Sequence, residues 1–393
     1  MDKFTYSIPT TLFFGAGKIE ELARVDLPGK KALIVISSGT SMRSFGYLDK
    51  LCSILVDQGL DFVVYDRILP NPIKYHVMEA AALCRRAACD FVVGLGGGSS
   101  IDSAKAIAVM ATNPGDYWDY VHGGSGLGKP VKNNPLPIIA VPTTAGTGTE
   151  ADPWTVITNE DKMEKIGFGY EKTFPMYSVV DPELMLSVPS HLTAYQGFDA
   201  FFHAAEGWIA TVATPISNLY ALKSMKLLYA SLSTAVHDGA DLMARSDVAL
   251  ASMLSGMVES TSSCTSQHSM EHAMSAYFPE LPHGAGLIML SEAYFTFFAK
   301  KATPRVAAMA RELMWGNPFM SEERQALDFV DKLVEMKESC GVAKLRMSDY
   351  GITKDDLPQF VKNARKTMGK LFAYDPYPLD DDDVLAIYKA AYK

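Results

Sequence analysis

Short apolar runs that end in small residues recur through the first 150 residues. Ala32-Leu-Ile-Val-Ile-Ser37 and Asp90-Phe-Val-Val-Gly-Leu95 are two of them, and similar runs occur at 61–65 and 136–142. A strand that reads as continuous apolar sequence is buried on both faces, as in a parallel sheet. Segments with helical spacing, such as 48–60, separate the runs. This alternation predicts an α/β region with a doubly wound, mostly parallel sheet of Rossmann type.

The sequence changes character near residue 190, beyond which apolar residues recur with helical periodicity. Helices are expected at 217–236, 241–259, 284–298, 304–314, 322–340 and 355–368, and after the acidic run Asp380-Asp-Asp-Asp383. A chain of 393 residues exceeds the ~250–300 at which a single core stops growing, so two domains are expected. We place an α/β dinucleotide-binding domain at 1–188 and an all-helical metal-binding domain at 189–393.

Composition narrows the classes of partner. The formal net charge is −9, so the chain has no basic surplus to meet phosphates, and neither nucleic acid nor a membrane is an expected partner. Five cysteines without a Cys-x-x-Cys spacing fit a reduced, cytoplasmic chain better than a disulfide framework. No run approaches the ~20 apolar residues of a membrane span, and no signal peptide is expected.

Two loops of small residues follow expected strand ends and indicate phosphate binding. Gly96-Gly-Gly-Ser99 lies at a strand-to-helix turn, where backbone N–H groups and a helix N-terminus attract a phosphate. The match to a dinucleotide fingerprint is imperfect, because Ser99 replaces the third glycine and the motif follows the third expected strand. A merely tight turn is the alternative. The loop at 143–149 ends the next strand, and two such loops together favour a pyrophosphate site.

Four of the eight histidines, with one aspartate, fall into a suggestive pattern. Asp199 and His203 are four residues apart, as are His268 and His272, and residues at this spacing share one face of a helix. His283 follows a proline, where the chain must turn. A lone histidine is more often a packed or exposed residue than a ligand, but two such pairs in a His-poor chain favour a metal site. Imidazole and carboxylate suit a divalent first-row metal such as iron or zinc.

Five motifs follow one another in a set order. They are Gly96-Gly-Gly-Ser99-x-x-Asp102-x-x-Lys105, Pro142-Thr-Thr-x-Gly-Thr-Gly-x-Glu150, Asp199-x-x-x-His203, His268-x-x-x-His272 and Pro282-His-Gly284. Together they resemble the iron-dependent (group III) alcohol dehydrogenases. The resemblance runs nearly end to end, from Phe14-Gly-Ala-Gly17 through Pro70-Asn-Pro72 to Asp383-Val-Leu-Ala-Ile-Tyr-Lys. One departure is Met270-Glu-His272, where relatives often have Met-Ala-His.

The resemblance implies a nicotinamide-binding α/β domain and a helical domain that carries the metal, Fe²⁺ with Zn²⁺ as the alternative. The metal ligands that it implies are Asp199, His203, His268 and His283, and the catalytic residue near the nicotinamide is His272. The cofactor-binding residues that it implies are Ser38, Gly39, Thr40, Ser41, Asn71, Gly97, Gly98, Ser99, Asp102, Thr143, Thr144, Thr147, Lys165 and Leu184. A homo-oligomer, a dimer or higher, is also implied.

The site chemistry fits reversible hydride transfer between a nicotinamide and a small primary alcohol, diol or aldehyde. A metal held by one carboxylate and three imidazoles keeps a position for a substrate oxygen, lowers the pKa of an alcohol or polarises a carbonyl. A neutral His272 suits a relay of the alcohol proton to water. Candidate apolar walls of the pocket, although such residues are as often core, are Phe198, Phe201, Phe202, Trp154 and Tyr277.

Two other functional classes stay open. A metallohydrolase would use the same aspartate and histidines to activate water. Such an enzyme needs no dinucleotide loops, so the two loops of small residues count against it. A polyol (glycerol-type) dehydrogenase or a lyase on the same fold is the third alternative, and the complete match of both histidine motifs weakens it.

The loop after the first expected strand indicates whether the cofactor is NAD(H) or NADP(H). NAD-specific folds place an acidic side chain beside the adenosine ribose, where it would repel a 2′-phosphate. Here the loop reads Ser37-Ser-Gly-Thr-Ser-Met-Arg43, and Gly39 stands where NAD-using relatives have an aspartate. This favours NADP(H) over NAD(H), with residues 38–41 around the 2′-phosphate and Arg43 nearby. The alternative is that an acid arrives from elsewhere, and Asp66 is the candidate.

Overall fold

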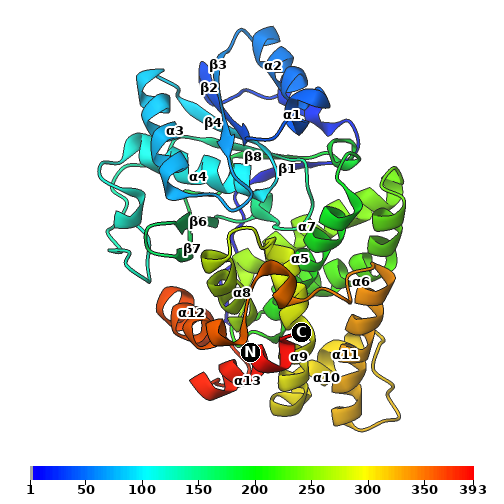
Figure 1. Ribbon diagram of the computed structural model, residues 1–393. Coiled ribbons are helices and arrows are strands. Elements are labelled where there is room, and N and C mark those ends of the chain that lie inside the picture. Colours follow the sequence, from blue (N-terminus) through cyan, green and yellow to red (C-terminus); the bar gives the residue numbers. More distant parts are fainter. Residues whose placement is uncertain (1–2) are drawn as a thin grey trace.

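The structure is a computed structural model that describes residues 3–393. A strand-rich region and a helical region lie at opposite ends of the molecule (Figure 1). The first contains a six-stranded parallel sheet in the order β1-β8-β5-β4-β2-β3. Its strands are β1 Thr11–Phe14, β2 Lys31–Ser37, β3 Asp61–Ile68, β4 Phe91–Gly96, β5 Ile138–Pro142 and β8 Tyr177–Val180. The predicted doubly wound α/β architecture is confirmed.

Helices cover both faces of this sheet. They are α1 Ser41–Ser44, α2 Tyr47–Asp57, α3 Lys74–Arg86 and α4 Gly98–Thr112. Side chains of a strand alternate between its two faces. Ala32, Ile34 and Ile36 of β2 accordingly pack in one core with α2. Leu33 and Val35 pack in the other core, with α3 and α4. Burial on both faces explains why β2 is an unbroken apolar run.

The strand order creates a switch point at β2 and β4. β2 pairs with β3 on one side and with β4 on the other. Ligands of open α/β sheets bind outside the carboxyl ends of the strands at such a point. The segments that follow the two strands are close together there, since a Cβ built on Gly96 would lie 4.0 Å from the Met42 sulfur. This edge is where a dinucleotide is expected.

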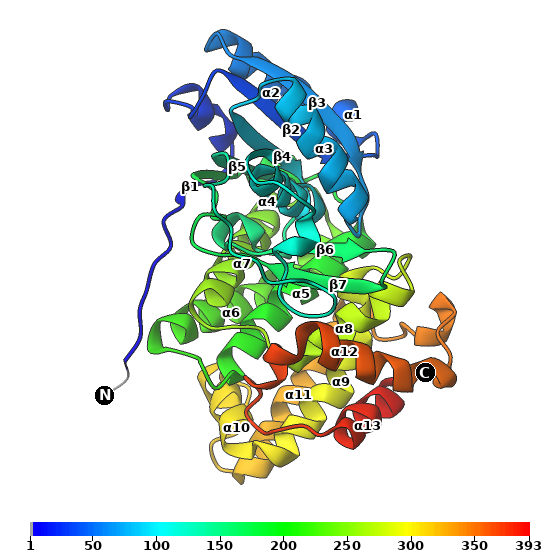
Figure 2. The same ribbon diagram turned by 90° about the vertical axis from the view of Figure 1, so that its left-hand side faces the viewer.

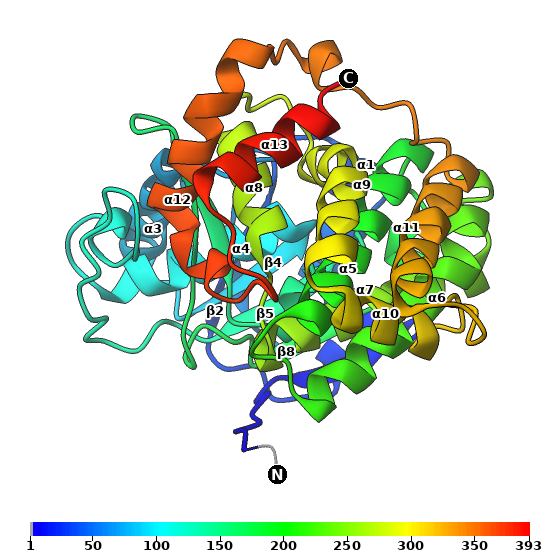
Figure 3. The ribbon, with the colours of Figure 1, turned by 90° about the horizontal axis from the view of Figure 1, so that it is seen from below.

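The helical region contains nine α-helices within residues 190–391. They are α5 Ser190–Ile209, α6 Pro215–His237, α7 Leu242–Thr261, α8 Ser266–Tyr277, α9 His283–Lys301, α10 Thr303–Glu312, α11 Glu322–Ser339, α12 Leu357–Phe372 and α13 Asp381–Ala391. The predicted helices all form, with ends shifted by a few residues. α9 contacts α5, α8, α10, α11 and α13 (Figure 3). Between residues 3 and 393, no helix has the length and apolar character needed to cross a membrane.

A β-hairpin joins the sheet to the helices. Its strands, β6 Thr155–Asn159 and β7 Glu164–Phe168, pair antiparallel. β6 contacts α4 of the sheet region, whereas β7 contacts α8 and α12 of the helical region (Figure 2). The hairpin therefore places side chains of the first region directly beside the helix that carries His268 and His272.

Two short strands, β1 and β8, are not predicted by the sequence pattern. They pair with each other along their whole length, from Thr11 opposite Tyr177 to Phe14 opposite Val180. Ahead of β1 the chain runs along the helical region (Figure 2). There the hydroxyls of Tyr6 and Tyr220 share a hydrogen bond of 2.8 Å. The first residues thus contact both regions of the molecule.

Two glycines bring the regions into backbone contact. Gly148, in the loop after β5, has a φ of +64°, and Gly256 lies within α7. A Cβ on Gly256 would lie only 2.0 Å from the carbonyl oxygen of Gly148. No side chain fits at either position, because backbone faces backbone.

Replacing Gly256 by alanine should destabilise the protein by about 1–3 kcal/mol, because the added methyl group overpacks this contact. Gly369→Ala in α12 is the matched control, since a Cβ there meets nothing within 4 Å. Its free energy of unfolding should stay equal or rise slightly. Denaturant unfolding followed by circular dichroism measures both. Equal stability of Gly256→Ala and wild type would contradict the contact.

Candidate metal centre and cofactor cleft

A cleft of about 940 Å³ lies between the sheet region and the helices. The glycine turn after β4 and strand β7 form one side of it, and helices α5, α7, α8, α9 and α12 form the other. The residues predicted as metal site and catalytic residue all line it: Asp199, His203, His268, His272 and His283. The predicted metal residues and the predicted cofactor-binding turn thus line the same cleft.

Three imidazole nitrogens surround one carboxylate oxygen in this cleft. His203 Nε2 is 3.6 Å from Asp199 Oδ1, and the Nε2 atoms of His268 and His283 are each 3.5 Å from it. Donors bonded to one ion at about 2.1 Å in a tetrahedron are about 3.4 Å apart. The observed spacing therefore fits a single bound cation. α5 supplies the first two residues, α8 the third and α9 the last.

The protein leaves some of these donor atoms without a partner. Within residues 3–393, Asp199 Oδ1 and His268 Nε2 are buried and accept or donate no hydrogen bond. Buried polar atoms are normally paired, because an unpaired one loses its hydration without compensation. A divalent cation bound between them would satisfy both atoms.

Burial and neighbouring groups together set the protonation of His203 and Asp199. Burial lowers the pKa of His203 to about 3, so this ring is neutral at physiological pH and can offer a lone pair to a metal. Burial alone would raise the pKa of Asp199, but the imidazoles of His203 and His283 outweigh it and hold that pKa below its usual range. A neutral imidazole and an ionised carboxylate are the metal-binding forms.

Two buried glutamates contact the far nitrogens of the histidine rings. His268 Nδ1 donates to Glu206 Oε1 at 2.5 Å, and His283 Nδ1 donates to Glu271. Each bond places the ring proton on Nδ1 and leaves Nε2 free to face Asp199. Glu271, the departure from the family motif, therefore points at the site. Glu206 was not predicted, although its spacing of three from His203 places both on one helix face.

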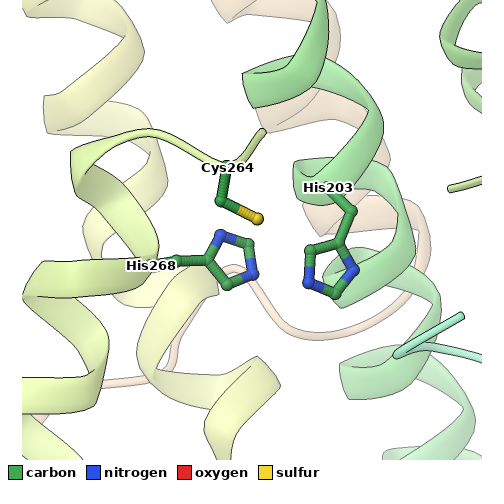
Figure 4. A group of neighbouring side chains, drawn as sticks. All are labelled: His203, Cys264 and His268. Carbon is green, nitrogen blue, oxygen red and sulfur yellow. The ribbon is translucent and has the colours of Figure 1, made fainter. Parts of the chain in front are cut away.

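Cys264 and Glu259 adjoin the same cluster and were also not predicted. The Cys264 thiol lies beside the rings of His203 and His268, whose centroids are 4.4 Å apart (Figure 4). Its sulfur donates to Glu259 Oε2 at 3.6 Å, and Glu259 Oε1 is 3.3 Å from His203 Nε2. Cys264 is four residues before His268, in the turn that precedes α8. Glu259 has no helical spacing to Asp199 or the histidines, and the packing of α7 against α5 brings it to the cluster.

His272 lies beside the cluster without facing Asp199. Its ring centroid is 6.4 Å from that of His268 and 5.2 Å from that of His283. Burial, assisted by the charge of Lys165, lowers its pKa well below the usual value, so the ring is neutral. Its Nδ1 is 2.9 Å from the sulfur of Met368 in α12.

The glycine turn after β4 leaves backbone accessible to a ligand. Gly96 has a φ of +143°, Gly97 precedes the first turn of α4, and Gly98 begins that helix. A Cβ on Gly98 would lie 2.5 Å from Thr147 Cγ2, so the turn and the loop at 143–149 touch. Backbone N–H groups at a helix N-terminus attract phosphate. The two predicted phosphate loops are therefore adjacent.

A buried lysine holds the second of these loops in place. Lys105 Nζ donates to the carbonyl and hydroxyl oxygens of Thr149, both at 2.7 Å, and to Asp152 Oδ1 at 3.0 Å. Asp102, predicted to bind cofactor, accepts from the Thr149 hydroxyl at 2.7 Å and from the Val156 N–H at 2.8 Å. Asp102 thus lines the cleft with both oxygens engaged by the protein.

Lys165 connects the cofactor side of the cleft with the metal side. Its Nζ is 3.2 Å from Asn71 Oδ1 and 3.6 Å from Glu271 Oε2. Asn71 in turn donates to the Pro279 carbonyl at 2.7 Å, shortly before His283 begins α9. Lys165 and Asn71 line the cleft as expected for predicted cofactor residues.

The remaining predicted cofactor residues lie elsewhere. Residues 38–40 form an exposed loop at the carboxyl end of β2, and Ser41 begins α1. Nearby, Arg43 forms an exposed ion pair with Asp66 at 2.7 Å. Leu184 is buried among the apolar residues of the sheet core.

The predicted aromatic pocket wall is wrong for four of its five members. Phe198, Phe201 and Phe202 are completely buried in the helical core, because they occupy faces of α5 that pack against other helices. Tyr277 packs on Phe360, with ring centroids 5.9 Å apart. Trp154 does line the cleft.

A Rossmann-type sheet that faces a carboxylate–imidazole cluster across one cleft fits a metal-dependent, nicotinamide-dependent dehydrogenase. Comparison with known proteins agrees. Residues 9–182 match the family described as "Iron-containing alcohol dehydrogenase", and residues 193–392 match "Fe-containing alcohol dehydrogenase family, C-terminal".

Similar proteins span the whole chain. The 1,3-propanediol dehydrogenase of Klebsiella pneumoniae is 32% identical over 393 residues, which cover 99% of each chain. Alcohol dehydrogenase 4 of Schizosaccharomyces pombe is 32% identical and covers 98% of this chain and 88% of its own. Among solved structures, an archaeal halo-thermophilic alcohol dehydrogenase from a Red Sea brine pool superposes with a TM-score of 0.94, at 30% identity and 99% coverage of both chains.

The chain belongs to the iron-containing alcohol dehydrogenase family. It is an oxidoreductase that acts on the CH–OH group of alcohols or diols, with Fe²⁺ and a nicotinamide cofactor. This assignment favours the dehydrogenase over the metallohydrolase and the lyase.

Glu206→Gln should weaken metal binding about 10- to 100-fold, as expected when the partner of a metal-binding imidazole is changed. Glu206 accepts hydrogen bonds from His268 and from the N–H and hydroxyl of Thr265. A glutamine cannot accept all of them, because one of its arms is a donor. The exposed Glu323→Gln in α11 is the control. Dissociation constants for Co²⁺, measured by chelator competition, should differ between the two variants. Equal constants would show that Glu206 does not orient His268.

Proposed function

We propose that Asp199, His203, His268 and His283 hold Fe²⁺, with Zn²⁺ as an alternative, and that the enzyme transfers hydride between NADP(H) and a small alcohol. The observation that carries this proposal is the placement of three Nε2 atoms 3.5–3.6 Å from Asp199 Oδ1. When bound, the metal supplies Lewis acidity, which lowers the pKa of an alcohol or polarises a carbonyl.

The residues of the chain then have separate tasks. Glu206 and Glu271 fix the ring orientation of His268 and His283. His272 is neutral and buried beside the cluster, so it is suited to take the alcohol proton and pass it to water in the cleft. Its place outside the group of nitrogens around Asp199 supports this role over that of a ligand.

The glycine turn and the loop after β5 support binding of the pyrophosphate. Gly97, Gly98 and Ser99 at the start of α4 would contact it, together with Thr143, Thr144 and Thr147 of the neighbouring loop. When bound, the nicotinamide accepts or gives the hydride. Lys165 and Asn71, between this turn and Glu271, would orient the nicotinamide end.

The preference for NADP(H) is supported by the exposed loop after β2. It lies at the switch point of the sheet, and residues 38–41 contain no acidic side chain. Asp66, the candidate acid, is paired with Arg43 at 2.7 Å. The arginine offsets its charge and adds a donor beside this loop, which suits a 2′-phosphate.

We also propose a cytoplasmic homo-oligomer, a dimer or higher. The five free cysteines support a reducing compartment. The oligomer rests on the family resemblance alone.

His268→Ala and His283→Ala should each lose bound metal and nearly all turnover, because each removes one of four donors. His272→Ala should keep its metal and lose rate. Metal per subunit, measured by plasma mass spectrometry, and turnover of a panel of C2–C6 alcohols and aldehydes check both. Full metal in His268→Ala or His283→Ala would contradict the ligand set, and circular dichroism confirms that each variant folds.

Gly39→Asp should lower the ratio of kcat/KM for NADP(H) over NAD(H) by about tenfold or more, because like charges in contact cost several kcal/mol. The backbone accepts the change, since a Cβ at Gly39 meets only Ser37 Oγ at 3.9 Å. Gly39→Asn has the same size without the charge and should change the ratio little. A wild-type ratio below one, or a ratio unmoved by aspartate, would overturn the NADP(H) preference.

A further inference from the structure

The wall of the cleft beside the metal cluster is polar throughout. It is the segment from the last turn of α7 to the turn before α8, and it consists of Glu259, Ser260, Thr261, Ser262, Ser263 and Cys264. All six residues line the cleft, and none carries an aliphatic or aromatic side chain. The phenylalanines expected as an apolar wall are in the helical core. This segment therefore offers an alkyl chain little apolar surface.

Most hydroxyls of this wall are already committed to the backbone. Ser260 donates to the Ala151 carbonyl at 3.0 Å, and Ser262 donates to the Gly207 carbonyl at 2.8 Å. Thr261 donates within its own helix, to a carbonyl 2.7 Å away. These bonds fix the conformation of the wall. They also occupy three of its hydroxyl groups, so few groups remain that could bind a ligand.

Glu259, in contrast, has one carboxylate oxygen without a hydrogen-bond partner among residues 3–393. Its Oε2 accepts from Cys264, but its Oε1 is buried and has no hydrogen-bond partner in the described part of the chain. The side chain is 13% exposed, in the cleft. A ligand in the cleft that carries a donor group would satisfy Glu259 Oε1.

Glu259 stands to one side of the metal donors. Its Oε1 is 3.3 Å from His203 Nε2, but no ion pair joins it to His268 or His283 among residues 3–393. Asp199 Oδ1, by contrast, is at 3.5–3.6 Å from all three nitrogens. An oxygen that adjoins only one of the three nitrogens lies at the edge of the group, where it can face a substrate bound next to the metal.

We infer that Glu259 recognises a second hydroxyl group of the substrate, and that the enzyme therefore prefers diols and polyols to unbranched alkyl alcohols. The inference rests on the proposed function, in which the reacting oxygen lies at the metal cluster. A second hydroxyl a few bonds away would donate to Glu259 Oε1. An alkyl alcohol would leave that oxygen buried and unpaired, and sites built to bind a hydroxyl reject analogues that lack it.

The test compares 1,3-propanediol with 1-propanol on metal-loaded enzyme. Wild type should favour the diol in kcat/KM by about ten- to hundredfold. Glu259→Leu should bring this ratio close to one, whereas Glu259→Gln, which keeps an acceptor oxygen, should retain much of it. Thr303→Val in α10 is the control, because its hydroxyl also donates to a helix carbonyl, that of Ala299 at 2.8 Å, and it lies outside the cleft lining, so it should leave the ratio unchanged.

Two further measurements separate this inference from its alternatives. Metal per subunit should be the same in Glu259→Leu and wild type, and a loss of metal would overturn the inference by making Glu259 a ligand. A preference for 3-amino-1-propanol that Glu259→Gln abolishes would overturn it by indicating recognition of an ammonium group.

Binding distinguishes failure of the inference from failure of the proposed function. The diol should raise the melting temperature of wild type more than 1-propanol does, and this difference should vanish in Glu259→Leu. If no alcohol is oxidised, the proposed function fails, and the melting shifts still decide the role of Glu259. If 1-propanol is oxidised as well as the diol, and Glu259→Leu changes neither ratio nor shift, the inference alone is wrong.

Discussion

Burial of a carboxylate amid three imidazoles is the constraint on which the rest of the structure depends. A carboxylate such as Asp199 is costly to bury alone, and the cost falls only when opposite charge or donors surround it. Three imidazoles do so here, at nearly equal distances from one oxygen. They come from three helices, so the spacing exists only if α5, α8 and α9 pack in one arrangement. The surrounding helical core enforces that packing.

Hydrogen bonds and ion pairs of two glutamates and one lysine connect this cluster to its surroundings. Glu206 and Glu271 fix the far sides of two rings, and Glu271 also meets Lys165, which belongs to the hairpin of the sheet region. Hydride transfer requires that donor and acceptor carbons be held in one geometry. The hairpin is placed to support this geometry, because it contacts α4 beside the proposed dinucleotide site and α8 beside the proposed metal site. A single connected network thus positions both halves of the reaction.

Much of the fold and of the site could be predicted from the spacing of residues along the sequence. Contacts between segments that are distant in the sequence could not. The long helices follow from periodicity, and the pairs led by Asp199 and His268 follow from the shared face of a helix. β1 and β8 were missed because four-residue strands carry too little pattern, and their partners are distant in sequence. The aromatic wall failed because helical spacing does not tell which face meets solvent. Glu259 gained its position only from the contact of α7 with α5.

Gly148 and Gly256 touch backbone to backbone, and this fixes how the cleft can change shape. Three residues beyond Gly256, α7 reaches Glu259 at the substrate wall, whereas the loop of Gly148 carries Thr143 and Thr144 on the cofactor side. Sliding of the helix past the loop would overlap two main chains in a close-packed interior. The contact therefore sets how closely α7 and the loop after β5 can approach each other, and with it the minimum width of this part of the cleft.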